Sequence, residues 1–117
     1  MTKLDPAAHL PLTPIVLHVL LALAEGERHG YAIAQEIETA TNGRVRAGPG
    51  TMYGSIQRML TASLIEEVAT HAADDERRRY YRATTLGRRV LDLELQRLVD
   101  VVAIARDKSL LPDPRIA

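Results

Sequence analysis

One stretch, residues 48–60 (GPGTMYGSIQRML), constrains the fold most, because it predicts a helix with two chemically different faces. Pro49 suits the first position of a helix, where its missing N–H would be unpaired anyway, and Gly48 can cap it. Apolar residues recur at the spacing of one buried helix face: Met52, Ile56, Met59 and Leu60. The opposite face is small, polar and cationic and holds no acid: Thr51, Gly54, Gln57, Arg58 and Thr61. Such a helix can pack on a core while its outer face binds an anion, so we interpret it as a DNA recognition helix.

Two further helices are predicted before this stretch. Residues 15–24 are apolar almost all round, which indicates a helix buried in its own core or in a subunit interface. Residues 25–30 form a turn, and residues 31–41 form a second helix with four residues facing inward: Ile33, Ala34, Ile37 and Ala40. Residues 1–13 contain two prolines and no sustained period, so we expect a flexible N-terminal arm.

A β-hairpin is predicted after the recognition helix. Residues 63–70 form its first strand, residues 71–76 a polar loop, and residues 77–83 a strongly cationic returning strand. Tyr80 and Tyr81 should point to opposite faces of that strand, because strand side chains alternate.

The last predicted element is a long helix over residues 85–108, capped by Thr84. Its apolar stripe is wider than one side of a small domain needs. Five of its residues follow the spacing of a helix–helix seam: Leu91, Leu95, Leu98, Val102 and Ala105. An ordinary terminal helix folded back on the domain is the simpler alternative, but we favour dimerisation because so short a core cannot cover this much Leu and Val.

The order of elements predicts a mainly α fold with a small β-hairpin, namely a winged helix-turn-helix followed by a long C-terminal dimerisation helix. We divide the chain into a flexible N-terminal arm (1–13), a winged helix-turn-helix DNA-binding domain (14–84), a C-terminal dimerisation helix (85–108) and a tail (109–117).

The formal net charge is zero, but the charges are unevenly distributed. Residues 39–58 carry Arg44, Arg46 and Arg58 and no acid, and residues 77–91 carry six arginines and no acid. Binding to phosphate depends on the local field at one surface, not on the sum over the chain. A merely solvated basic face is the alternative; two acid-free segments on either side of a polar-faced helix favour DNA binding.

Several other functions lack their sequence signals. The chain has no cysteine, which excludes disulfides and thiolate metal sites and fits a reducing cytoplasm, where we expect the protein. Its four histidines show no zinc-protease pattern, and its glycines at positions 48, 50 and 54 lack the lysine of a phosphate loop. The apolar run at 15–24 is too short to span a bilayer. Nothing therefore indicates an enzyme, a metal, a cofactor or a membrane partner.

The sequence resembles the PadR family of transcriptional regulators, in particular its short members with a single C-terminal helix. The resemblance runs from about residue 15 to 95. It rests on several motifs in order: His29-Gly30-Tyr31, Gly48-Pro49-Gly50-Thr51-Met52-Tyr53, Leu64-Ile65, Arg78-Arg79-Tyr80-Tyr81-Arg82 and Thr84-Thr85-Leu86-Gly87. Gly54 departs from the proline common in the family, and Ala83 from a larger aliphatic residue. The chain has no Trp, so the binding of flat drugs between tryptophans that some members show cannot be carried over.

The resemblance implies a homodimeric repressor whose third helix enters the major groove while the wing contacts the flanking backbone. It also implies that the first helix helps the C-terminal helices to form the dimer. With the seam residues predicted above, we expect the interface to contain Leu17, Leu20, Leu91, Leu95, Leu98, Val102 and Ala105. Two units related by a two-fold axis would read a pseudo-palindromic operator with half-sites roughly 10 bp apart. Whether a small-molecule effector releases the protein from DNA is left open.

The expected DNA contacts combine the recognition helix, its approach and the wing. They are Thr51, Tyr53, Gly54, Gln57, Arg58, Arg46, Tyr31, Arg77, Arg78 and Arg79. Gly54 would let the helix lie close to DNA, and Arg78 is the favoured wing contact. For Tyr31 and Tyr53, packing in the core is an equal alternative. A winged-helix protein–protein module that does not bind DNA is the alternative function.

Overall fold

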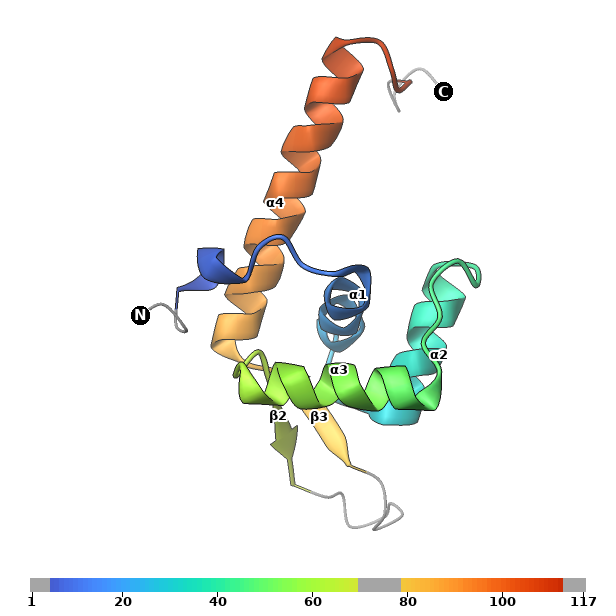
Figure 1. Ribbon diagram of the computed structural model, residues 1–117, viewed down its shortest axis with the longest axis vertical. Helices are drawn as coiled ribbons and strands as arrows, with labels where there is room; N and C mark the ends of the chain where they lie inside the picture. The colour runs from blue at the N-terminus through green and yellow to red at the C-terminus, as the bar shows by residue number, and fades with distance from the viewer. Residues whose placement is uncertain (1–4, 70–78, 113–117) are drawn as a thin grey trace.

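The computed structural model describes residues 5–69 and 79–112. Its elements follow the order η2 (Pro6–His9), α1 (Pro14–Leu23), β1 (Arg28–His29), α2 (Gly30–Ala40), α3 (Pro49–Thr61), β2 (Ile65–Val68), β3 (Tyr80–Ala83) and α4 (Thr85–Asp107). Three helices and a small sheet make up the body, and α4 leaves that body as a projecting rod (Figure 1). This is the predicted mainly α fold with a winged helix-turn-helix and a long C-terminal helix.

The helices begin where their capping residues predict. The Thr13 hydroxyl accepts from the Val16 N–H at the start of α1, and the Thr84 hydroxyl accepts from the Gly87 N–H at the start of α4. At α2 the cap is His29, whose Nδ1 accepts from the Ala32 N–H at 3.2 Å. α3 begins at Pro49 after Gly48 and has no side-chain cap.

The core closes on the predicted faces of the three helices. Met52, Ile56 and Met59 of α3 are buried, as are Ile33 and Ile37 of α2. Ala40, which we expected to face inward, is exposed at the end of α2. That part of the prediction is wrong, because the three residues of α2 after the buried Ile37 are all exposed and the core no longer covers the helix there.

The sheet contains a strand that the sequence did not indicate. β1 pairs antiparallel with β3, and β3 pairs with β2, so the strand order is β1-β3-β2. Residues 25–30 were expected to form only a turn. A two-residue strand has no alternation to detect, and its pairing with β3 depends on residues more than fifty positions away. Tyr80 and Tyr81 do differ as predicted: Tyr81 is buried, whereas Tyr80 is half-buried and meets the His29 ring edge-on.

The described part of the expected flexible arm is packed on the body. Pro6–His9 form a 3-10 helix that lies against α4, with Asp5 accepting from the Ala7 N–H at its start. Leu10 and Leu12 pack against the core, and the Leu12 N–H donates to a carboxylate oxygen of the buried Glu94 at 3.0 Å. The expectation of an unstructured arm is therefore wrong for this part, because a residue of α4 far along the chain supplies its partner.

Candidate nucleic-acid interface

The outer face of α3 is open along its length. The helix lies across the front of the body with the hairpin below it (Figure 1), and Thr51, Gln57 and Arg58 are exposed. None of the thirteen residues of α3 is acidic. The buried side and the exposed side therefore divide as predicted, and the exposed side can approach a polyanion without repulsion.

Arg58 is held in a defined orientation on this face. Its Nη2 donates to the hydroxyl of Ser55, one turn earlier, at 3.3 Å. Arg58 takes part in none of the ion pairs found among the described residues. Ser55 is only 2% exposed, and it was not among the site residues predicted from the sequence. The available signal was a small polar residue on the buried side of an otherwise apolar helix face.

Tyr31 and Tyr53 do not pack in the core. Their exposed fractions are 69% and 67%, so the packing alternative is wrong for both. The Tyr31 ring stacks on His29 with centroids 6.5 Å apart, and its hydroxyl accepts from Gln35 at 3.1 Å. An oxygen that already accepts from Gln35 still has its own proton to donate to another acceptor.

A groove of about 620 Å³ lies between the start of α2 and the start of α3. Both exposed tyrosines line it, with Met52 and Tyr81 among its apolar residues. The groove brings the first turns of two helices, where backbone N–H groups lack helical partners, to one surface. This arrangement links the two helices of the helix-turn-helix at the face expected to meet DNA.

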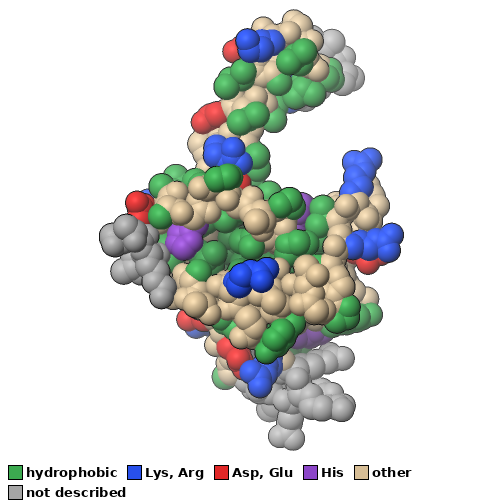
Figure 2. All heavy atoms as spheres, in the orientation of Figure 1, with side chains coloured by type: hydrophobic (Ala, Val, Ile, Leu, Met, Phe, Trp, Pro, Cys, Tyr) green, Lys and Arg blue, Asp and Glu red, His purple; other side chains and the backbone are tan. Residues whose placement is uncertain are grey.

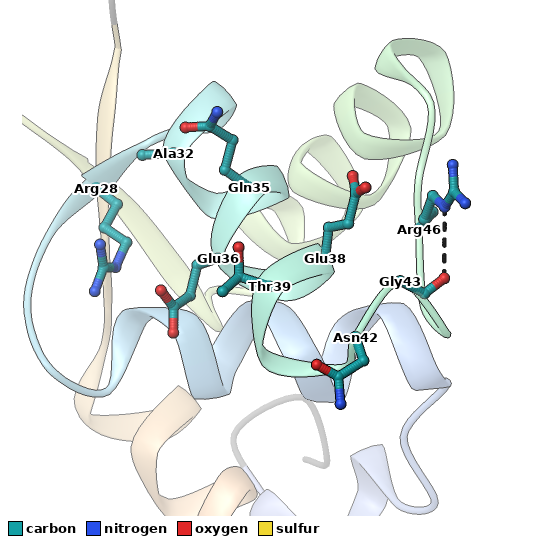
Figure 3. Close-up of a pocket in the computed structure, with 9 residues that line it drawn as sticks. All are labelled: Arg28, Ala32, Gln35, Glu36, Glu38, Thr39, Asn42, Gly43 and Arg46. Carbon is teal, nitrogen blue, oxygen red and sulfur yellow. Dashed lines mark hydrogen bonds between the residues drawn. The ribbon is translucent and has the colours of Figure 1, made fainter.

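Arg46 lies at the edge of a second, more polar groove of about 890 Å³ along the outer side of α2 (Figure 3). Figure 3 shows Arg28 and Arg46 at opposite ends, with Glu36 and Glu38 between them. The Arg46 Nε donates to the Gly43 carbonyl at 3.4 Å, which fixes the side chain beside the approach to α3. Because two acids lie between the two arginines, this groove has no single-sign field.

The wing, which is the hairpin of β2 and β3, is less basic in the folded structure than its sequence suggests. Glu66 lies opposite Arg82 in the antiparallel register, and the two side chains form an ion pair at 2.8 Å. Glu67 pairs with Arg79 at 3.6 Å. The segment 77–91 contains no acid in sequence, but the neighbouring strand β2 supplies two, so acids oppose the described arginines of this cationic strand. Arg77 and Arg78 lie outside the described residues.

The cations on the visible face are dispersed. Figure 2 shows the Lys and Arg side chains as separate blue areas on a largely tan and green surface. A continuous basic field is the usual mark of strong non-specific binding to DNA. One copy of this face therefore offers few phosphate contacts, and a high affinity would need a second copy or the residues of the wing that are not described.

The seven residues expected at a dimer interface fall into two groups. Leu20 and Leu91 are 0% and 3% exposed inside the chain's own core, so they are not available to a partner and their assignment is wrong. Leu91 belongs to the predicted seam of the last helix, but α1 and the first turns of α4 pack against each other and the body instead. Leu17, Leu98, Val102 and Ala105 are half-buried, and Leu95 is exposed.

Two further kinds of site find no support among the described residues. No helix in residues 5–69 and 79–112 has the length and apolar character needed to cross a membrane. Over the same residues, no three His, Cys, Asp or Glu side chains gather as they would around a metal ion.

Comparison with known proteins finds a family model and several relatives that match this sequence. A model of the transcriptional regulator PadR-like family matches residues 17–93. An uncharacterised protein X from Lysinibacillus sphaericus is 36% identical over 80 residues, which cover 68% of this chain and 71% of that protein. The transcriptional regulator Rv3488 of Mycobacterium tuberculosis is 35% identical over 75 residues, covering 64% of this chain and 66% of that one.

Solved structures show the same fold. A PadR family transcription regulator from Clostridium difficile superimposes with a TM-score of 0.69 at 23% identity, covering 81% of this chain and 97% of that one. Bacillus subtilis PadR in complex with operator DNA gives a TM-score of 0.63 at 20% identity, covering 73% of this chain and 48% of that one. At such identities the likeness establishes the fold, and the family comes from the sequence match.

Proposed function

The chain belongs to the transcriptional regulator PadR-like family, and we propose that it is a homodimeric repressor that binds a pseudo-palindromic operator through α3 and its wing. A DNA-binding transcriptional regulator is the general function of this family. The finer statements, namely repression, the dimer, the operator symmetry and the individual contacts, are our proposal. They are supported by the surfaces that the chain leaves exposed.

The observation that carries DNA binding is the acid-free outer face of α3. In a helix-turn-helix, the N-terminal part of the recognition helix contacts base edges, and neighbouring elements contact phosphates. Thr51 and Tyr53 are exposed on the first two turns of α3, and Gln57 is exposed on the third, so these three suit the first role. Tyr31 and Arg46, which both line the groove at the start of α3, suit the second.

The observation that supports a dimer is the apolar surface of the projecting half of α4. Val99, Val101 and Ile104 are 59%, 50% and 56% exposed. Val99 lies on one side of the helix, and Val101 and Ile104, three residues apart, lie together on another. Leu95, Leu98 and Val102 form an apolar stripe on the helix surface between Val99 and Val101. A helix that is apolar on several sides needs a covering partner, and a second copy supplies a complementary stripe by symmetry.

Repression and its release complete the proposal. A dimer bound across a promoter blocks access of the transcription machinery to the DNA that it covers. The apolar contacts between α1 and α4 join the DNA-binding body to the dimer helix, so a small molecule that entered there would change the spacing of the two α3 helices. No chemical class of effector is favoured by the described residues.

The proposal is tested by titrating the full chain against a labelled duplex from the region upstream of its own coding sequence. Fluorescence anisotropy should show binding that weakens steeply with salt, as expected when phosphate contacts release counterions. A duplex of the same composition with shuffled sequence is the control, and it should bind more weakly. Absent or salt-independent binding would favour the protein–protein module instead.

A further inference from the structure

The Arg58 guanidinium lies one turn closer to the start of α3 than its own backbone does. Helical side chains lean toward the N-terminus, and four residues of helix correspond to about 6 Å along the axis. A Cβ placed at Gly54 would lie 3.4 Å from Nη1 of Arg58. The guanidinium therefore lies over the helix surface at position 54, where glycine has no side chain. The charge is thereby carried back to the part of the helix that reaches base edges.

Ser55 fixes this position from the buried side. Its hydroxyl accepts one hydrogen bond from Nη2, and Ser55 itself is 2% exposed, so the acceptor cannot move far. A guanidinium has five N–H donors in a planar fork. One bond to Ser55 leaves the outer donors free, and none of the ion pairs among the described residues includes Arg58.

We infer that Gly54 and Ser55 are positioning residues that present Arg58 as a guanine-reading fork, so that each half-site of the operator contains a guanine recognised by this side chain. The inference rests on the proposed DNA binding. Guanine is the base that offers two acceptors, O6 and N7, to one planar donor pair in the major groove. A randomly oriented arginine would instead serve as a phosphate contact, which adds affinity without sequence preference.

The test begins with selection of the full-length wild type against a randomised duplex library. Single base-pair replacements and a 7-deazaguanine replacement, which removes N7, are then measured in the selected duplex by anisotropy. At one guanine per half-site, either change should lower wild-type affinity by about tenfold or more. Arg58→Lys should reduce this loss to less than about threefold, because lysine keeps the charge but lacks the fork.

Two further variants separate positioning from charge. Ser55→Ala should show a reduced guanine preference with an unchanged salt slope, because its charges are unchanged. Arg106→Ala, at the far end of α4, is the matched control and should keep the wild-type base profile. Thermal unfolding of each variant checks that it is folded.

The possible results distinguish a failure of guanine reading by Arg58 from a failure of the proposed operator binding. An Arg58→Lys profile identical to that of the wild type would overturn guanine reading by Arg58. A wild-type profile in Ser55→Ala would overturn the positioning role of Ser55. Wild-type protein that selects no sequence at all would overturn the proposed operator binding, and this inference with it.

Discussion

Single residues matter most at two kinds of position in this protein. At one kind a polar side chain is buried, and at the other the packing leaves no space for any side chain. Among the described residues, Ser55 and Glu94 are the buried polar side chains, and both have hydrogen-bond partners. Gly87 is buried at the start of α4, where a Cβ would overlap the Leu64 carbonyl. Gly54 is its opposite, since a Cβ there would meet only Nη1 of the Arg58 side chain, at 3.4 Å.

Gly87→Ala should destabilise the fold by about 2–4 kcal/mol, because either the start of α4 or the Leu64 backbone must shift. Gly54→Ala is the matched control and should be neutral or stabilising by up to about 1 kcal/mol, since alanine favours the helix. Urea unfolding followed by circular dichroism measures both. Equal effects of the two substitutions would contradict the close approach at Gly87.

Glu94 should make stability depend on pH in the acid range. Hydrogen bonds from Arg97, at 2.6 and 3.1 Å, lower the pKa of the Glu94 carboxyl, and burial opposes this only in part. A lowered folded-state pKa gives stability that is present above the unfolded value of about 4.3 and is lost as the pH falls through the folded value.

Glu94→Gln keeps an acceptor for the Leu12 N–H but removes the charge. The variant should be less stable than the wild type at pH 7, and this difference should shrink as the pH falls below about 4. Urea unfolding across that range measures it, with Asp100→Asn, an exposed acid further along α4, as the control. A difference that is constant with pH would rule out the contribution of the Glu94 charge.

At the scale of elements, α4 has two parts with different surroundings. Its first turns carry Val90, Leu91 and Glu94, which are buried against the body. Its second half projects from the body with apolar side chains exposed on several sides (Figure 1). The wing is an element of a different kind, since strand pairing opposes its arginines with acids of β2.

Leu98→Glu should dissociate the proposed dimer, raising its dissociation constant by about a hundredfold or more, because a charge would be buried without a partner. Gln96→Glu adds the same charge on another side of α4 and should leave the dimer intact. Sedimentation velocity over a range of concentrations measures both. A Leu98→Glu protein that is as dimeric as the wild type would place the interface elsewhere.

Glu67→Gln should tighten DNA binding by a few fold at low salt, because it releases Arg79 from its partner and removes an acid from the wing. Its effect on stability should be less than about 1 kcal/mol, as the pair is exposed. Asp107→Asn, at the end of α4, changes the charge equally and should not alter binding. Unchanged affinity in Glu67→Gln would mean that this strand does not approach DNA.

At the scale of the whole molecule, zero net charge and dispersed cations mean that the proposed binding to DNA depends on the proposed dimer. One copy presents a single arginine on α3, so affinity must come from a second α3 and from both wings. Two linked sites bind more tightly than one because the second binding event is intramolecular. In the proposed dimer, the apolar end of α4 and the polar face of α3 therefore serve one function.

Arg78→Ala should weaken binding uniformly across sequences and shallow the salt dependence by about one unit for each phosphate that the variant no longer binds. Arg78 lies outside the described residues, so this prediction comes from the sequence. Operator and shuffled duplexes titrated over a salt series measure it, and Lys108→Ala is the control. A weakening confined to the operator would instead assign Arg78 to base reading.

The sequence by itself determined the four α-helices, the hairpin of β2 and β3, and the two faces of α3. Helix periodicity, Thr13 and Thr84 as caps, and Pro49 at a helix start are local signals, and each acts within one or two turns. The family follows from the same local motifs, taken in order. For these features no contact distant along the chain had to be known.

Only the tertiary structure decided which residues are exposed and able to contact DNA or a partner. It placed Leu20 and Leu91 in the core, Tyr31 and Tyr53 at the surface, and Glu66 beside Arg82. It also paired β1 with β3 and joined Leu12 to Glu94, 82 positions away. Burial and charge pairing depend on residues that meet only when the chain has folded, and a sequence period gives the face of a helix but not what covers that face.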